Sequence, residues 1–512
     1  MPARDLGTKT LARMSMPHAR PSRVLRLPRW GRFQGRLIHP SPPSDPWRAV
    51  ELHAQFRAPS GRLHRHWGYF DGGSAWGFRF RPDETGSWHY HASFSDGAAA
   101  VEGTFEVTEG TLAGPVCLHE HNPRWFGRRG GGRFFPRGLH VGDRYFAANW
   151  PVAKRRRFLT WFRQQGYNLI SVASCFVNRD ADGRGRGWDT PALWPLDPSH
   201  YARLETLLDE LESRDIVLFP FAGFFGQDGH HPTEPADQTL YLRYALARLG
   251  WYRNIILNVA GPEPNLKARP WMPIEDVVRL GQEIATLDPY GTPLTVHNET
   301  GDDEFKHADW CTYGTLQGPK TVSRTTLFKG LRKNRHWAKP LFAQETLWTG
   351  NFVHLKNNPA EPRDEYTEDD VRKNGWTIAL IGAGLCYADN QGTSSTGFSG
   401  TMELRDRRQR YHDILKAIWD FMETLPFERM QPVYDAADLP VCLAEPGRDY
   451  LFYLEAGGSL TLNIPEPEGY RATWIDARDT TKQRPAKPDA ADAKRYTVPA
   501  GGDDWLLRLK RR

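Results

Sequence analysis

The feature that most constrains this chain is an alternation of two hydrophobic patterns between residues 134 and 425. Short apolar segments rich in β-branched and aromatic residues predict strands buried on both faces. They are separated by segments whose apolar residues recur at the helical spacing. The predicted strands are 134–140, 167–173, 216–221, 254–259, 294–297, 310–313, 340–343 and 384–387, and the predicted helices are 158–165, 201–214, 240–249, 274–287, 325–335, 369–381 and 406–425. Eight buried strands alternating with helices predict an α/β chain folded as a (β/α)₈ TIM barrel.

On both sides of this region the pattern changes to short strands of alternating polarity, which is typical of antiparallel β-sandwiches. We therefore predict a basic, disordered tail at 1–36, an N-terminal β-sandwich at 37–112, a catalytic barrel at 113–428 and a C-terminal β-sandwich at 429–512. Each sandwich could serve only to cover the barrel or to shape its rim, or it could bind carbohydrate independently.

Composition narrows the partners of the chain. The formal charge of +6 is small for 512 residues, and no basic stripe interleaved with aromatics predicts nucleic-acid binding. No apolar stretch is long enough to span a membrane, and no signal peptide is visible. The five cysteines show no metal-ligand spacing and indicate reduced thiols: Cys117, Cys175, Cys311, Cys386 and Cys442. We expect a cytoplasmic protein without cofactor or metal, with secretion as the alternative if the chain starts elsewhere.

Two of the predicted strands end on a glutamate. Glu263 follows the strand at 254–259, after a break at Gly261 and Pro262, and Glu345 follows the strand at 340–343. Catalytic groups of a barrel lie at the carboxyl ends of its strands. Strands four and seven lie nearly opposite each other, so these two carboxylates can face one another across the mouth. Glycoside cleavage requires such a pair, and we assign Glu263 as the acid/base and Glu345 as the nucleophile.

The chain also resembles known glycosidase families. Segments 56–61, 70–72 and 79–88 are similar to the immunoglobulin-like DUF5060 domain that precedes the barrel of many bacterial glycosidases. Residues 113–428 resemble clan-A retaining glycoside hydrolases of the family 5 type, above all the apiosidase-like DUF4038 group, which often has a C-terminal β-domain named for collagen binding. The residues that carry this second resemblance are 134–138, 165–168, 178, 255–263, 297–298, 339–345 and 382–384.

This resemblance implies retaining hydrolysis of a carbohydrate, with Glu263 and Glu345 in the roles given above. One position departs from the clan, which has an asparagine directly before the acid, where it contacts the sugar 2-hydroxyl. Pro262 stands there in this chain. The departure puts that contact in doubt, although it leaves the acid itself in place.

Further polar and aromatic residues follow the predicted strands and could line the substrate cleft. Tyr313 stands where the clan places an aromatic hydroxyl near the nucleophile, and Trp348 could stack on a sugar ring. The candidate substrate-binding residues are His140, Asn178, His297, Asn298, Tyr313, Trp348, Asp389 and Gln391. Each of them could equally be structural.

Several alternatives remain open at this stage. The barrel could be a catalytically inactive carbohydrate-binding or scaffold protein. If it is catalytic, Glu299 is the main alternative to the two glutamates assigned above. Asn178, Arg179, Asp180 and Asp182 could bind sugar or calcium, although a mobile surface loop is the simpler interpretation. A metal-assisted hydrolase using His230 and His231 is disfavoured, because neighbours in a strand point to opposite faces. The sequence leaves open the sugar, its linkage, exo or endo action and the oligomeric state.

Overall fold

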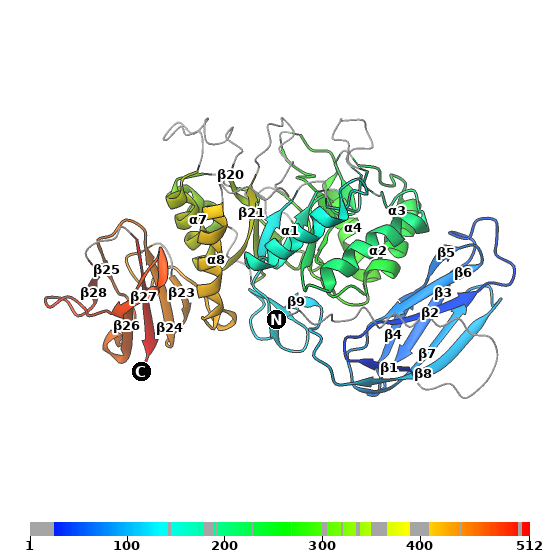
Figure 1. Ribbon diagram of the computed structural model, residues 1–512, viewed down its shortest axis with the longest axis horizontal. Coiled ribbons are helices and arrows are strands. Elements are labelled where there is room, and N and C mark those ends of the chain that lie inside the picture. Colours follow the sequence, from blue (N-terminus) through cyan, green and yellow to red (C-terminus); the bar gives the residue numbers. More distant parts are fainter. Residues whose placement is uncertain are drawn as a thin grey trace.

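The computed structural model has three parts, a β-sandwich, a central α/β unit and a second β-sandwich, arranged in chain order (Figure 1). The residues that it describes are 25–141, 145–173, 175–178, 189–190, 192–227, 229–267, 269–298, 305–318, 321–333, 338–349, 366–389, 409–439, 442–499 and 504–512. All structural statements below refer to these ranges.

The N-terminal part is a sandwich of two sheets around an aromatic core. The larger sheet has the order β1 (Leu25–Pro28), β8 (Ala100–Thr108), β7 (Gly86–Phe94), β3 (Leu52–Arg57) and β4 (Leu63–Trp67). The smaller sheet has the order β2 (Phe33–Ile38), β6 (Ala75–Phe80) and β5 (Tyr69–Gly72). Rings from both sheets interlock in the core, with Phe56 stacked on Phe80 at 4.2 Å.

The predicted disordered tail at 1–36 was wrong for residues 25–36, because this segment forms β1 and most of β2. Leu27, Phe33 and Leu37 are buried in the sandwich core, whereas Arg26 and Arg36 are exposed. The exposed arginines lie between apolar residues that face inward, so the alternation typical of a strand was not recognised in the sequence. Residues 1–24 lie outside the described part of the chain.

The central unit is built on a curled parallel sheet of six strands. Its order is β14 (Val217–Pro220), β13 (Leu169–Val172), β12 (Arg137–His140), β21 (Ala383–Asp389), β20 (Leu341–Thr349) and β19 (Gly314–Thr315). Two short parallel pairs accompany it, β16 (Leu257–Asn258) with β18 (Leu294–Thr295) and β15 (Phe225–Gly226) with β17 (Ala260–Gly261). Because β12 pairs with both β13 and β21, the first and last predicted strands are neighbours.

Helices cover the outer face of this sheet (Figure 1). They are α1 (Val152–Gln164), α2 (Pro198–Glu212), α3 (Pro235–Leu249), α4 (Ile274–Leu287), α5 (Arg324–Arg332), α7 (Glu368–Leu380) and α8 (Gln409–Glu423). None of the helices within the described ranges is both long and apolar enough to cross a bilayer.

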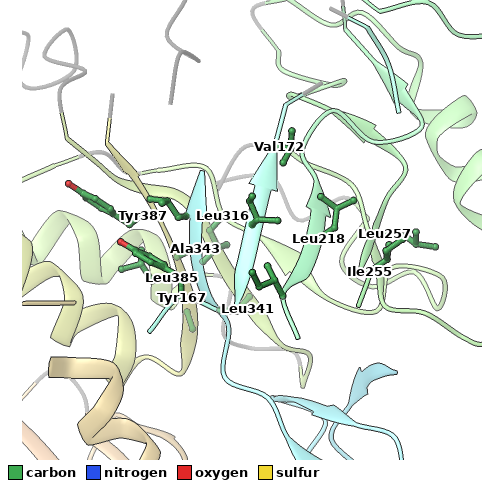
Figure 2. Packing of buried hydrophobic residues seen from close by; sticks show 14 of the residues in the cluster. Tyr167, Val172, Leu218, Ile255, Leu257, Leu316, Leu341, Ala343, Leu385 and Tyr387 are labelled. Carbon is green, nitrogen blue, oxygen red and sulfur yellow. The ribbon is translucent and has the colours of Figure 1, made fainter. Parts of the chain in front are cut away.

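Successive residues of each strand alternate between two apolar clusters. Val172, Leu218, Leu341 and Leu385 belong to the cluster that packs toward the helices, and Figure 2 labels them among its members. Their neighbours face the interior and form a separate cluster that includes Leu169, Val217, Phe219, Phe342 and Cys386. This alternation decides which polar side chains of the strands point inward.

A small antiparallel sheet closes one end of the interior. It consists of β9 (Val116–Leu118), β10 (Phe126–Arg128) and β11 (Gly132–Arg133). Val116, Phe126 and the following Phe134 belong to the interior cluster. The chain enters β12 directly from this sheet, so the sheet lies at the amino ends of the parallel strands.

The C-terminal part is a sandwich that shares a core with the central unit. Its main sheet has the order β22 (Gln431–Val433), β23 (Cys442–Glu445), β24 (Asp449–Leu454), β29 (Trp505–Arg511), β26 (Tyr470–Asp476) and β27 (Asp479–Pro485), and β25 (Ser459–Thr461) pairs with β28 (Arg495–Thr497). Leu443, Leu451, Ile475 and Leu506 belong to the same apolar cluster as the helices of the central unit. The indole of Trp376 in α7 donates to the carbonyl of Ala477 at 3.0 Å.

The N-terminal sandwich meets the central unit through charged groups. Arg79 of β6 donates to both carboxylate oxygens of Glu205 in α2, at 2.7 and 3.0 Å. Arg248 of α3 binds the same carboxylate at 2.7 and 3.1 Å. Arg81, which follows β6, binds Glu212 at the end of α2 at 2.9 Å. This contact surface is therefore rich in buried ion pairs.

Candidate active site

The alternation of the strands carries two polar side chains to the interior at the carboxyl end of the sheet. Leu139 packs toward the helices, and so the next residue, His140, faces the interior. Ser171 faces the interior for the same reason, because Ile170 and Val172 pack toward the helices. His140 Nδ1 lies 2.9 Å from Ser171 Oγ, and both residues are buried. His140 and Ser171, on two neighbouring strands, thus form part of a polar layer next to the apolar interior.

Strand β20 adds Gln344 and Glu345 through a β-bulge. Its register with β21 shifts between Ala343 and Leu347. The backbone amides of Gln344 and Glu345 both donate to the carbonyl of Leu316, at 3.0 and 3.2 Å. A bulge re-aims side chains that would otherwise alternate. Gln344 Nε2 reaches Ser171 Oγ at 3.2 Å, and Glu345 Oε2 lies 3.8 Å from His297 Nε2.

Glu263 is fixed by its backbone next to His297. Its amide donates to the His297 carbonyl at 2.8 Å, while the His297 amide donates to Asn258 Oδ1 at 3.0 Å. Glu263 has a φ of 36°, in the left-handed region that residues other than glycine rarely adopt. Such strained positions concentrate at functional sites. The carboxylate is 4% exposed, and its Oε2 lies 3.4 Å from Arg269 Nη2.

Aromatic contacts connect these residues into one group. The ring of Phe221 lies 4.9 Å from that of His140 and 4.4 Å from that of His297. The ring of Trp348 lies 6.3 Å from that of His140. The structure therefore brings together five residues that the sequence singled out, and we call them the mouth cluster: His140, Glu263, His297, Glu345 and Trp348.

The other candidates fall in several places. Asn298 is buried directly after His297, Asn178 is half-buried, and Asp389 ends β21. Tyr313 donates to the carbonyl of Leu257 at 2.9 Å, and its ring lies 5.2 Å from Phe126 of the small closing sheet. The structure thus places Tyr313 in the interior core, whereas the sequence led us to expect it in the cleft. The positions outside the described residues are Arg179, Asp180, Asp182, Glu299 and Gln391.

Four residues near the mouth cluster were missed by the sequence analysis. Ser171 and Gln344 support His140, Asn258 holds the backbone of His297, and Arg269 contacts Glu263. Ser171 carried one usable signal, a hydroxyl in the middle of an apolar strand. Gln344 and Asn258 make contacts with segments that are distant in the sequence, whereas Arg269 lies only six residues after Glu263, and no local pattern reveals any of the three.

Cys386 lies on the interior face near Glu345, in surroundings that disfavour its thiolate. Burial raises the pKa of its thiol well above the usual range, and the Glu345 carboxylate raises it further, whereas a hydrogen bond with Ser171 opposes the change. A thiol without a nearby cation stays protonated at neutral pH and reacts poorly. Among the described residues, no three His, Cys, Asp or Glu side chains are grouped as a metal site would need.

Comparisons with known proteins agree with the fold. Residues 26–95 match the family model of DUF5060, a domain of unknown function. A solved structure of a protein provisionally assigned as a glycoside hydrolase, from Bacteroides vulgatus ATCC 8482, superposes with a TM-score of 0.72 at 18% identity, covering 95% of this chain and 100% of that one. A family 5 glycoside hydrolase from the same organism has a TM-score of 0.56 at 16% identity, covering 78% and 93%. No curated protein matches the sequence.

A third structure, described as a glycoside hydrolase, has a TM-score of 0.57 at 13% identity and covers 78% of this chain and 97% of its own. Identities this low establish the fold and not the activity. The chain therefore has an N-terminal DUF5060 domain and shares the fold of solved glycoside hydrolases, which confirms these two parts of the resemblance, while the DUF4038 and collagen-binding-type assignments stay predictions.

Proposed function

We propose that the protein is a retaining glycoside hydrolase that cleaves O-glycosidic bonds of an oligo- or polysaccharide. The observation that carries this proposal is the convergence of both predicted catalytic glutamates on His297. Glu345 approaches its imidazole at 3.8 Å, and Glu263 binds its carbonyl through the backbone at 2.8 Å. Both carboxylates are buried, Glu263 just after β17 and Glu345 in the bulge of β20, which suits a pair of catalytic carboxylates.

We further propose that the curled sheet closes into a complete (β/α)₈ barrel. Backbone hydrogen bonds support closure where the six-stranded sheet ends. The amide of Leu218 donates to the Asn254 carbonyl at 2.7 Å, which connects β14 to the chain that enters β16. The amide of Thr312 donates to the Leu294 carbonyl at 2.8 Å, which connects β18 to the chain that enters β19.

In the proposed mechanism, Glu263 donates its proton to the glycosidic oxygen while Glu345 attacks the anomeric carbon. The C–O bond to the leaving group breaks, and a glycosyl ester forms on Glu345. Glu263, now ionised, removes a proton from water, which attacks the same carbon and releases Glu345. Two inversions leave the anomeric configuration unchanged. Phe221 packs against His140 and His297, and Trp348 packs against His140, which places apolar rings beside the proposed catalytic pair.

The proposal is tested on a panel of aryl pyranosides and furanosides with wild-type protein and with Glu345→Ala and Glu263→Ala. Wild type should cleave at least one member, and NMR should show the first sugar product with retained configuration. Azide should rescue Glu345→Ala by forming a glycosyl azide of inverted configuration, and it should rescue Glu263→Ala with retention. Glu102→Gln, at an exposed position of β8, is the control and should not change the rate. A Glu345→Ala variant that cleaves as fast as wild type would overturn the assignment.

The second candidate is an inactive barrel that only binds carbohydrate. The arrangement of Glu263 and Glu345 in a crystal structure, beginning with the distance between their carboxyl carbons, distinguishes an active glycosidase from an inactive barrel. About 5–5.5 Å is expected for a retaining pair, and roughly 6.5–9.5 Å would indicate inversion. A Glu263 carboxylate pointing away from Glu345, together with saturable binding of a sugar without turnover, would favour the binding protein.

A further inference from the structure

A cavity of about 440 Å³ lies at the opposite end of the central sheet from the mouth cluster. Arg137, the first residue of β12, lines this cavity, whereas His140, the last residue of the same strand, belongs to the mouth cluster. The N-terminal sandwich contributes Arg29 and Trp30, and the end of α8 contributes Glu423. The cavity is therefore formed jointly by the sandwich, the small closing sheet and the central unit.

The lining carries an excess of positive charge. Six arginines face three acidic residues, Glu109, Asp215 and Glu423; the arginines are Arg29, Arg128, Arg129, Arg133, Arg137 and Arg163. Asp215 is already bound to Arg128 at 2.9 Å. Glu423 is shared between Arg133 at 3.3 Å and Arg137 at 3.7 Å. The carboxylates in the wall are thus too few for the guanidinium groups around them.

Three of these arginines are held in place by backbone carbonyls. Arg29 donates to Asp83 at 2.7 Å, Arg129 to Tyr290 at 2.7 Å and Arg163 to Tyr167 at 3.0 Å. Each guanidinium has five N–H donors, so these bonds orient the groups and leave further donors available. Fixed cations with open donors are the arrangement that binds oxyanions in forked pairs.

The crowding of cations has a physical cost that a bound anion would offset. A guanidinium does not lose its proton at neutral pH, so the repulsion persists. Burial lowers the pKa of Arg137, and the nearby Arg163 lowers it further, while Glu423 acts in the opposite direction. Trp30 and Phe134 supply apolar wall beside the arginines. The volume of the cavity is within the range of pockets that take small organic ligands.

We propose that this cavity binds a small multivalent oxyanion, a phosphate ester or a polycarboxylate, through Arg29, Arg137 and Arg163. The ligand would contact the N-terminal sandwich and the central unit at the same time and would strengthen the contact between them. The proposal concerns a site remote from the mouth cluster and does not depend on glycosidase activity.

Isothermal titration of the full chain with pyrophosphate and with citrate, at constant ionic strength and neutral pH, tests this site. Saturable binding of one equivalent is expected, and preference for pyrophosphate or for citrate identifies the phosphate or the carboxylate class. Arg137→Gln and Arg163→Gln should each weaken binding by about tenfold or more, because each removes a charge-assisted hydrogen bond. Arg163 is exposed and bonds only to a backbone carbonyl among the described residues, so this variant should remain folded.

Arg65→Gln, at an exposed position of β4 outside the cavity, removes the same charge and should leave affinity unchanged. Absence of saturable heat with both anions would overturn the proposal. So would equal affinity of Arg163→Gln and wild type, or an equal loss of affinity in Arg65→Gln, which would indicate only a diffuse response to net charge.

Discussion

Glu212 should be one of the most important single charges for stability. It ends α2, and its carboxylate binds Arg81 at 2.9 and 3.2 Å and Arg32 at 3.0 Å, with Arg253 at 3.4 Å. Arg81 is almost completely buried, with 1% of its side chain exposed, and burial lowers its pKa. Glu212→Gln keeps the size of the side chain but leaves this buried cation without its carboxylate.

The size of the effect follows from two independent arguments. Burial alone would raise the pKa of Glu212, but Arg81, Arg32 and Arg253 outweigh it and lower the pKa from 4.5 to about 2. A carboxyl whose pKa is lower in the folded than in the unfolded protein stabilises the fold at pH values above its unfolded pKa. This stabilisation is lost as the pH falls from about 4.5 to 2. A shift of this size corresponds to about 3 kcal/mol. Removing one partner of a buried ion pair costs ~3–5 kcal/mol, which agrees.

The effect of Glu212→Gln can be measured by urea unfolding followed by tryptophan fluorescence. The quantity compared is the free energy of the first unfolding transition in the variant and in the wild type. The two proteins should differ by about 3 kcal/mol at pH 7, and the gap should nearly close toward pH 2, where about half of wild-type Glu212 is protonated. Glu102→Gln, which removes an exposed carboxylate of β8, should match wild type at every pH. A gap below about 0.5 kcal/mol at pH 7, or one that persists unchanged at pH 2, would refute the reasoning.

Two further predictions concern the proposed active site. Ser171→Ala removes the hydroxyl that contacts both His140 and Gln344, so kcat/KM on the best aryl glycoside should fall about tenfold, and the melting temperature should also fall modestly because both buried groups lose a hydrogen-bond partner. An unchanged rate would mean that the hydroxyl orients neither residue. Arg269→Gln removes a cation 3.4 Å from Glu263, which should move the alkaline limb of the pH–rate profile upward by less than about one unit, since Arg269 is mostly exposed. Lys267→Gln in the same loop is the matched control, and an equal shift there would contradict a specific contact.

Local patterns were sufficient for much of the fold and for the centre of the candidate site. The parallel strands, the helices and the DUF5060 domain all follow from periodicity and short motifs. Glu263, His297 and Glu345 stand at or just after the predicted strand ends, and the structure brings them together, although β20 continues past Glu345 to Thr349. The closure of the barrel and the roles of the glutamates remain predictions.

What the sequence did not reveal depends on contacts between distant segments. Residues 25–36 were taken for a disordered tail because their arginines suggest a solvated segment, but Arg32 pairs with Glu212 far along the chain. Tyr313 is the last residue of the predicted strand 310–313, yet the direction of its side chain is decided by contacts with Phe126 and Leu257. The bulge that turns Glu345 toward His297 has no local signature either, because it depends on the pairing of β20 with β21.

The two sandwiches are joined to the central unit by different forces, and this has a consequence for how the molecule comes apart. The C-terminal sandwich shares a continuous apolar core with α7 and α8. Truncation of the chain after residue 428 would therefore expose hydrophobic surface and favour aggregation. The N-terminal sandwich adds a few aromatic residues, such as Tyr69, to that core, but it also depends on carboxylates of α2 that bind buried arginines. Acid protonates those carboxylates and leaves apolar packing intact. As the pH falls, the N-terminal sandwich should therefore dissociate from the central unit first. The central unit and the C-terminal sandwich should unfold together.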